Sequence, residues 1–271
     1  MITIGIVGYG YVGKAVYDYL STHYNVIYYD PFLEGACSKE EINRCKYAFV
    51  CVNTPSLKSG KCDTSIVEEV IDWIESPYIC IKSTVEPGTT DYLIQKTNKK
   101  IVFSPEYLGE STYHTGPYDF NKDMNKHSYF IFGGDKECTD EFINLCIKIS
   151  GPSKRYIQTD AKSAEVAKYT ENIWLATKVI FSNEMDQICK SLNVNWSEVR
   201  ELWLNDPRVT RSHTAVFRDN KTPFGGKCLP KDTEALLHVS NNNGYSADFL
   251  KSVINSNIRI GKRNSLNEQF L

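Results

Sequence analysis

The chain has 271 residues, a formal net charge of −2, 41% hydrophobic residues and 24% charged residues. That length can bury a sizeable core and favours two domains, and the composition is that of an ordinary globular protein. Basic residues form no dense run and no apolar run approaches the roughly 18 residues of a membrane span, so neither nucleic acid nor a membrane is expected as a partner.

The nine cysteines are scattered along the chain, and none of them has the spacing of a zinc site. Met1 leads directly into a strand pattern, without the basic segment that opens a signal peptide. The sequence therefore predicts free thiols in a reducing compartment, a cytoplasmic location and no bound metal.

The first apolar run, residues 2–7, ends in the glycine-rich stretch Gly8-Tyr9-Gly10-Tyr11-Val12-Gly13. A helix is predicted over residues 14–20, and a second strand over residues 25–29 leads into Asp30. A strand, three spaced glycines, a helix, a strand and an acid in this order are typical of a dinucleotide site.

Each part of that site has a physical role. Gly8 permits the tight turn, Gly10 lets the pyrophosphate approach the backbone, and Gly13 lets the helix and strand pack closely. The helix N-terminus supplies amide donors to the phosphates. Asp30 accepts hydrogen bonds from ribose hydroxyls and repels a 2′-phosphate, so the expected cofactor is NAD rather than NADP.

Strands and helices continue to alternate, as in βαβ units. Strands are predicted over residues 47–52, 78–82, 100–103, 129–132 and 154–157, and helices over residues 64–75, 89–97 and 139–149. Several of these strands stop at small polar clusters. Because the carboxyl ends of parallel strands line one crevice, Thr54, Thr84 and Glu106 are expected to face the same cleft.

The pattern changes from Thr159, where a helix without proline or glycine is predicted to run to about Ser191. Val166, Ile173 and Ile180 recur at seven-residue intervals and predict a buried seam, while the tryptophans are interpreted as packing residues. Shorter helices are predicted over residues 196–204, 231–239 and 247–261. The expected fold is a Rossmann-type doubly wound parallel α/β sheet over residues 1–158, followed by an all-α domain over residues 159–271.

A cysteine in a setting that favours reactivity, Cys228, lies in the segment Gly225-Gly226-Lys227-Cys228-Leu229-Pro230-Lys231-Asp232. The glycines let the backbone come close to a ligand. Lys227 and Lys231 can hold the Cys228 thiol partly as the thiolate that attacks carbon, and Asp232 can move a proton or orient a water molecule. The sequence therefore predicts a nucleophilic cysteine.

In order along the chain, these motifs resemble those of the nucleotide-sugar 6-dehydrogenases, and most closely the members that act on UDP-glucose. The resemblance covers nearly the whole chain. Besides the glycine-rich stretch and the Cys228 segment, it rests on Asn53-Thr54-Pro55, Lys82-Ser83-Thr84-Val85, Ser104-Pro105-Glu106-Tyr107-Leu108-Gly109-Glu110-Ser111, Ala164-Glu165 with Lys168 and Asn172, and Asp206-Pro207-Arg208-Val209.

The resemblance implies a four-electron oxidation of UDP-glucose to UDP-glucuronate by two NAD molecules, through a thiohemiacetal and a thioester on Cys228. Asp232 and Thr84 would position or activate the hydrolytic water, and Lys168 and Asn172 would hydrogen-bond the substrate oxygen. Glu110 would act in acid–base or water-handling work, and Glu106 would orient groups around it. Expected cofactor contacts are Gly8, Gly10, Tyr11, Val12, Gly13, Asp30, Thr54, Pro55, Thr84, Glu110 and Lys231. Expected substrate contacts are Tyr107, Leu108, Gly109, Glu110, Lys168, Asn172, Arg208, Phe224, Gly225 and Cys228.

The resemblance also implies a homodimer joined through the long helix, with Arg208 reaching the neighbouring subunit's substrate. Three features depart from the family's pattern. The chain stops at Leu271, where a further C-terminal domain usually begins, so contacts to the uridine diphosphate are expected to be weaker. The loop before Cys228 is longer than usual, and Gly109 stands where arginine or alanine is more common.

Three alternatives stay open. The substrate can be another nucleotide sugar, such as UDP-N-acetylmannosamine or GDP-mannose. A β-hydroxyacid dehydrogenase shares the Rossmann-plus-helix plan and a helix lysine like Lys168, but it needs no thiol, so the Cys228 segment argues against it. The third alternative is a nucleotide-binding protein that has lost turnover.

Overall fold

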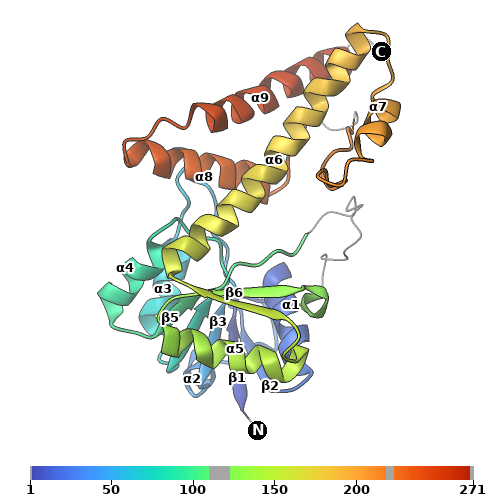
Figure 1. The fold of residues 1–271 in the computed structure, drawn as a ribbon. Coiled ribbons are helices and arrows are strands. Elements are labelled where there is room, and N and C mark those ends of the chain that lie inside the picture. The colour runs from blue at the N-terminus through green and yellow to red at the C-terminus, as the bar shows by residue number, and fades with distance from the viewer. Residues whose placement is uncertain (1, 110–122, 218–222, 269–271) are drawn as a thin grey trace. The chain divides into compact units, whose positions relative to one another are not determined.

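A computed structural model describes residues 2–109, 123–217 and 223–268, with side chains described up to residue 262. These residues form two compact units (Figure 1). The first unit holds residues 2–57, 62–109 and 123–168, and the second holds residues 58–61 together with the described residues from 169 onward. Each unit has a hydrophobic core of its own.

The first unit is built on a seven-stranded sheet in the order β2-β1-β3-β4-β5-β6-β7. Its strands are β1 (Thr3–Val7), β2 (Asn25–Tyr29), β3 (Tyr47–Val50), β4 (Tyr78–Ile81), β5 (Ile101–Phe103), β6 (Tyr129–Gly133) and β7 (Arg155–Thr159). Adjacent strands are parallel except β5 and β6, which are antiparallel and pair at Phe103 and Gly133. The predicted doubly wound sheet is confirmed, with this one antiparallel step as a correction. A parallel step needs a crossover helix, and residues 104–128 carry no apolar pattern for one.

Both faces of this sheet are buried, which explains the continuous apolar runs of its strands. Side chains alternate between two clusters: Phe49 and Cys80 point to one face, whereas Val50 and Ile81 point to the other. The first face is covered by α1 (Tyr11–Ser21) and α5 (Lys136–Ser150), and the second by α2 (Lys39–Asn43), α3 (Ser65–Trp73) and α4 (Thr89–Thr97).

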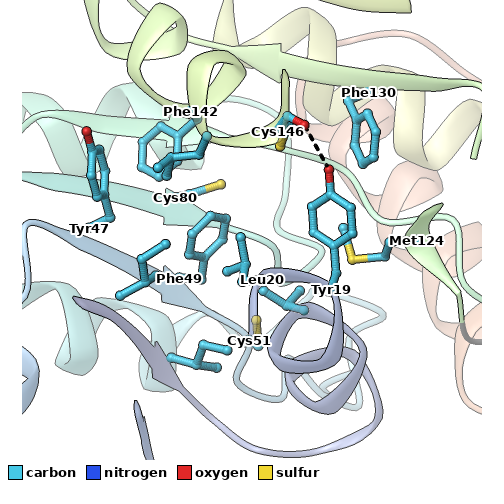
Figure 2. Close-up of a cluster of buried hydrophobic side chains, with 14 of the residues drawn as sticks. Tyr19, Leu20, Tyr47, Phe49, Cys51, Cys80, Met124, Phe130, Phe142 and Cys146 are labelled. Atoms are coloured by element: carbon cyan, nitrogen blue, oxygen red, sulfur yellow. Dashed lines mark hydrogen bonds between the residues drawn. The ribbon is translucent and has the colours of Figure 1, made fainter. Parts of the chain in front are cut away.

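Figure 2 shows the first of these two clusters, where aromatic rings from sheet and helices fill the interior. Phe142 of α5 packs edge-on against Phe49, with ring centroids 5.4 Å apart. The buried Tyr19 hydroxyl donates a hydrogen bond to the Cys146 carbonyl at 3.4 Å. Tyr19 thus finds a polar partner inside the core, and α1 is tied to α5.

Two short elements carry no periodic signal in the sequence. The helix α2 is only five residues long, and it is closed by a capping box in which Ser38 and Glu41 bond each other's backbone N–H. A 3-10 turn spans Met124–Lys126. Both are too short for apolar periodicity to reveal them.

The second unit is helical. The helix α6 (Ala161–Ser191) enters it from the first unit, and α7 (Trp196–Trp203), α8 (Cys228–Asn242) and α9 (Asp248–Glu268) follow. A small core joins Ala176, Val179 and Ile180 of α6 to Phe224 and Val253. In the part of the chain that the structure describes, none of the helices is both long and apolar enough to span a membrane.

The predicted seam on α6 is wrong for its first member. Val166 is 39% exposed, Ile173 is half-buried, and only Ile180 lies in the core. Trp174, interpreted as a packing residue, is 59% exposed. The buried positions of α6 include small, polar and aromatic residues such as Ala176, Lys178 and Tyr169, so apolar periodicity alone did not identify its buried face.

Candidate active site

The glycine-rich turn of the first unit has a shape that other residues cannot adopt. Gly8 has φ +89°, and a Cβ there would lie 2.8 Å from the Cys51 carbonyl oxygen. A Cβ on Gly13 would lie 2.0 Å from the Gly8 oxygen. Gly10, by contrast, would meet nothing within 4 Å. Packing thus requires glycine at Gly8 and Gly13, whereas Gly10 leaves open space where a pyrophosphate fits.

The helix α1 begins directly after this turn. Its N-cap, Gly10, supplies no side-chain hydrogen bond, and the N-terminus of a helix attracts an anion through its N–H groups and its partial positive charge. Tyr11 and Val12 form its first turn, and the Tyr11 hydroxyl donates to the Gly109 carbonyl at 2.6 Å. This bond joins the glycine-rich turn to the segment that carries Tyr107 to Gly109.

Asp30 stands at the end of β2 and shapes both neighbouring turns. One carboxylate oxygen accepts the Tyr9 N–H at 2.9 Å, and the other accepts the Phe32 N–H at 3.1 Å. The half-exposed carboxylate keeps lone pairs for further donors, as the two hydroxyls of a ribose would require. Together with the open face at Gly10, it fits the adenosine and pyrophosphate of NAD.

The ends of β3 and β4 meet at Thr54 and Thr84. The Thr54 hydroxyl is buried and donates to the Thr84 carbonyl at 2.7 Å. Pro55, which is exposed, accepts the Asp63 N–H at 2.8 Å through its carbonyl. The structure thus brings the predicted residues of two neighbouring strand ends together.

A second cluster of the first unit contains Glu106, Tyr107 and Lys168. The Lys168 Nζ lies 4.0 Å from Glu106 Oε1 and 5.1 Å from the centroid of the Tyr107 ring. Glu106 also accepts the Leu108 N–H at 2.8 Å. Lys168 is 5% exposed, so its charge is held beside a carboxylate and a ring face and not in water.

Lys82 supports this cluster and was not among the predicted site residues. Its buried Nζ donates to Ser104 Oγ at 3.2 Å and to the Pro105 carbonyl at 3.0 Å. It also lines a small pocket with Glu106 and Tyr107. A lysine at the end of an apolar strand, in Ile81-Lys82-Ser83, was the available signal.

In the second unit, Cys228 is the first residue of α8 and is exposed. The sequence predicted that this helix starts at Lys231. The helix starts three residues earlier, at Cys228, and Pro230 falls in its first turn. Proline is tolerated there because N–H groups of the first turn have no acceptor within the helix. The partial positive charge of the helix N-terminus therefore lies at the thiol, where it stabilises an anion.

Asp232 lies one helical turn after Cys228 and is 1% exposed. One of its oxygens accepts a hydrogen bond from Asn172 Nδ2 at 2.5 Å, and the other is 2.6 Å from Lys231 Nζ. The carboxylate is thus held by an amide and an ammonium. Asn172 follows Lys168 by four residues on α6, so the two side chains leave the same face of that helix.

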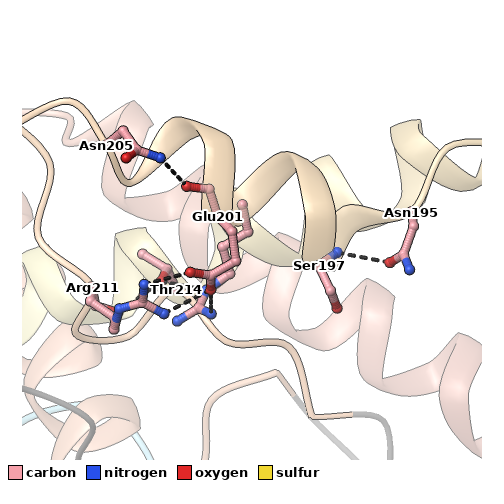
Figure 3. Close-up of polar contacts among 7 residues, drawn as sticks. Asn195, Ser197, Glu201, Asn205, Arg211 and Thr214 are labelled. Atoms are coloured by element: carbon pink, nitrogen blue, oxygen red, sulfur yellow. Dashed lines mark hydrogen bonds and ion pairs between the residues drawn. The ribbon is translucent and has the colours of Figure 1, made fainter.

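Arg208 follows α7 and is 87% exposed by its side chain, which pairs with Asp206 at 2.5 Å. The surrounding loop is braced by Arg211 against Glu201 at 2.5 Å and by Arg200 Nε on Thr214 Oγ1 at 2.9 Å (Figure 3). These contacts fix the loop and leave the guanidinium of Arg208 accessible.

Two further sets of contacts hold Thr210 and Phe224, which lie between Arg208 and Cys228 in the sequence. The buried Lys178, whose pKa is lowered by burial, donates to the Thr210 carbonyl at 3.1 Å and hydroxyl at 2.8 Å. Phe224 is buried in the core, and its backbone is bonded at both ends by Asn257 at 3.0 Å. The next residue, Gly225, is exposed.

The predicted residues therefore fall into two groups, one in each unit. Glu110 lies outside the described residues. None of the nine cysteines forms a disulfide within the described structure, and the described residues contain no cluster of three His, Cys, Asp or Glu side chains that could hold a metal ion. Burial raises the pKa of the core thiols, to about 12 for Cys51 and about 11 for Cys146.

Two domain models of one family match the chain. Residues 32–144 match the NAD-binding domain of the UDP-glucose/GDP-mannose dehydrogenase family, and residues 162–259 match its central domain. A UDP-glucose 6-dehydrogenase of Rickettsia bellii is 31% identical in an alignment of 228 positions that covers 80% of this chain and 50% of that protein. A GDP-mannose 6-dehydrogenase of Pseudomonas savastanoi is 31% identical in an alignment of 238 positions that covers 80% of this chain and 52% of that protein.

Among solved structures, a UDP-glucose dehydrogenase of Pyrobaculum islandicum has a TM-score of 0.80 at 24% identity, covering 95% of this chain and 68% of that one. A UDP-D-ManNAc dehydrogenase of Pyrococcus horikoshii has a TM-score of 0.75 at 22% identity, with the same coverage. These likenesses show the fold. The chain spans about half the length of the curated relatives it matches.

Proposed function

We propose that this chain, which belongs to the UDP-glucose/GDP-mannose dehydrogenase family, oxidises a nucleotide sugar at its primary alcohol to a carboxylate. The observation that carries the proposal is the arrangement of Cys228 at the start of α8 with the buried Asp232 one turn later. A two-electron alcohol dehydrogenase has no use for a thiol in this position. A four-electron oxidation does, because the aldehyde must be held and then released as an acid.

NAD is the cofactor of the first unit, whose matched domain is an NAD-binding domain. Gly8, Gly10 and Gly13 would receive the pyrophosphate, the start of α1 would supply its amide donors, and Asp30 would bond the ribose. When bound, NAD would accept one hydride, which carries the two electrons of each oxidation. We further propose contacts from Thr54, Pro55, Thr84, Glu110 and Lys231.

Lys168 and Asn172 donate hydrogen bonds to the alcohol oxygen of the substrate as negative charge develops on it. Both are 5% exposed and lie on one rigid helix, so their donors are fixed before the substrate arrives. Glu106 orients Lys168 across 4.0 Å and can take part in moving the alcohol proton, together with Glu110.

Cys228 acts on the aldehyde formed by the first oxidation. Its thiolate forms a C–S bond to the carbonyl carbon, whose oxygen takes a proton to give a thiohemiacetal. The second oxidation removes a hydride from that carbon and the proton from its oxygen, which leaves a thioester. Water then adds, the C–S bond breaks, and the products are the carboxylate and the thiol. Asp232, with Thr84, positions the water and accepts its proton.

We propose UDP-glucose as the substrate and UDP-glucuronate as the product. Tyr107, Leu108, Gly109, Phe224 and Gly225 are the further substrate contacts that we propose. The relatives include both a UDP-glucose and a GDP-mannose 6-dehydrogenase at 31% identity, so GDP-mannose and UDP-N-acetylmannosamine are the alternatives.

A homodimer through α6 is supported by an exposed apolar stripe on that helix. Trp174, Phe181 and Ile188 recur every seven residues and are 59%, 47% and 43% exposed. Such a stripe is typical of a helix that packs against a partner. We propose that Arg208, which is exposed, binds the substrate of the neighbouring subunit. A cytoplasmic location would keep the exposed Cys228 thiol reduced.

The test is the number of NADH molecules formed per sugar, followed at 340 nm with UDP-glucose, GDP-mannose and UDP-N-acetylmannosamine. We expect two NADH per UDP-glucose, and loss of carboxylate formation by at least about 10³-fold in Cys228→Ser. Cys37→Ser, which changes a half-buried thiol that is not part of the proposed site, is the control and should turn over as wild type.

One NADH per sugar in the wild-type protein would contradict the thioester route. NAD binding without turnover of any of the three sugars would contradict catalysis and leave a nucleotide-binding protein.

A further inference from the structure

The N-terminus of α4 is capped by a residue from a distant part of the chain. Its N-cap is Gly88, with φ +97° and no side chain, so the helix provides no cap of its own. The carboxylate of Glu165, which is fully buried, fills that role. It accepts the Gly88 N–H at 2.5 Å, the Thr90 N–H at 2.9 Å and the Thr90 hydroxyl at 2.6 Å.

The residues around this cap leave little room for movement. The first turn of α6 packs directly on the end of β6, where a Cβ on Gly133 would lie 2.6 Å from the Ala164 Cβ. Gly88 is covered by Lys162, whose Cε would lie 3.3 Å from a Cβ on that glycine. Glu165 is therefore fixed by its own helix and by the loop that it caps.

Lys168 follows Glu165 by three residues on α6, so the two side chains are one turn apart on the same side of the helix. The capped loop begins at Thr84, whose carbonyl is bonded by Thr54. Glu165 thus connects the turn of α6 that carries Lys168 to the loop that carries Thr84.

We propose that Glu165 is a positioning residue: its bonds to Gly88 and Thr90 set the place of Lys168 relative to Glu106 and of the Thr84 loop. Glu165 does not itself touch the reacting atoms in this assignment. The catalytic part of the inference rests on the proposed function, whereas the structural part, the cap, does not.

The cap should also respond to pH. Burial raises the pKa of Glu165 to about 7, against the opposing effect of the hydrogen bonds from Thr90 and Gly88. Of the charged groups nearby, Asp91 on α4 raises the pKa further, and Lys162 on α6 covers Gly88. Glu86 belongs to the capped loop, and its carboxylate accepts the Cys62 N–H. When the hydrogen bonds from Gly88 and Thr90 break, Glu165 is exposed to water, where its ionised form is favoured over its protonated form. The cap should therefore open more readily as the pH rises through about 7.

The structural part is tested by amide hydrogen exchange of Gly88 and Thr90, followed by NMR at pH 6 and pH 8 and corrected for the intrinsic rate. Glu165→Leu keeps most of the volume but removes both acceptors, so we expect exchange at least about 10-fold faster at both amides. Glu165→Gln keeps one acceptor and no charge, so we expect intermediate protection that no longer depends on pH. Glu184→Gln, an exposed position of α6, is the matched control and should exchange as wild type.

The positioning role is tested by turnover. We expect Glu165→Leu to lower kcat about 10-fold or more, and Glu165→Gln to restore part of that kcat. If Glu165→Leu does not fold, Thr90→Val replaces it. That change removes one hydrogen bond to the carboxylate and should move the midpoint of the pH-dependent protection upward by about one pH unit.

Unchanged exchange of Gly88 and Thr90 in Glu165→Leu, or an unmoved midpoint in Thr90→Val, would overturn the cap. Faster exchange with unchanged kcat would overturn the positioning role. If the wild-type protein turns over no nucleotide sugar, the proposed function fails by that result, while the exchange measurements still decide the cap.

Discussion

The two units hold their candidate groups in different ways. In the first unit, Lys168 is 5% exposed, is set against Glu106 and Tyr107, and follows the buried cap of Glu165. In the second unit, Cys228 and the Arg208 guanidinium are exposed, whereas Asp232 and Asn172 are buried.

The difference separates two tasks. A donor that stabilises developing charge works best when it is fixed in advance and shielded from water, as Lys168 is. A nucleophile or an arginine that must meet a substrate or a second copy has to remain accessible. Changes in the first unit should therefore alter turnover and cofactor binding, and changes on the exposed surface of the second unit should alter covalent chemistry and assembly.

The largest effect should come from the buried donor of the first unit. Lys168→Met is expected to lower kcat about 10²–10³-fold, because the charge on the alcohol oxygen loses a fixed donor, while the Kd for NAD stays the same. Steady-state kinetics and calorimetric NAD binding measure the two quantities. Lys190→Met, at a half-exposed lysine of α6 that pairs with Asp186, is the control. A wild-type kcat in Lys168→Met would remove the contrast between the units.

The buried carboxyl of the first unit should make stability depend on pH. The folded-state pKa of Glu165, about 7, lies above its ordinary value of 4.5, so the folded protein binds this proton more tightly than the unfolded chain does. Its contribution to the free energy of unfolding is present below about pH 4.5 and is lost as the pH rises through about 7, by about 3 kcal/mol at most. Urea unfolding between pH 5 and pH 8 should show this decline in wild type and not in Glu165→Gln. Parallel curves for the two proteins would contradict it.

The exposed stripe of the second unit should matter for assembly and not for folding. Trp174→Ala is expected to weaken the homodimer about 30-fold, because a large exposed aromatic side chain contributes about 2 kcal/mol when it is buried in an interface. Sedimentation equilibrium measures the dimer Kd. Leu202→Ala, at a residue of α7 that is 75% exposed and off the stripe, is the control and should leave the Kd unchanged. Equal effects of both variants would argue against a dimer through α6.

The smallest effect should come from the ribose contact. Asp30→Asn keeps the size of the side chain but removes its charge, and we expect about 10-fold weaker binding of NAD. Titration calorimetry gives the Kd, and Glu34→Gln in the same exposed turn is the control. A Kd unchanged in Asp30→Asn would mean that Asp30 only shapes the turns at Tyr9 and Phe32.

Features that depend on neighbours in the chain could be predicted from the sequence. Gly8 has a positive φ within the turn, Gly13 is required by its steric contact with Gly8 in the same turn, and Asp30 follows from its place after β2. The alternation of apolar runs and helix patterns gave the strands of the sheet and the length of α6, which has no proline or glycine to end it.

Features that depend on partners far along the chain were decided by the tertiary structure. Glu165 bonds Thr90 across 75 positions, and Asp232 bonds Asn172 across 60, so neither pair leaves a local pattern. The buried face of α6 was predicted from apolar spacing, yet the protein buries Lys178 and Asn183 there and exposes Trp174. The physical reason is the same in each case: the sequence fixes what a side chain can bond or bury, but which partner it meets depends on how distant segments pack.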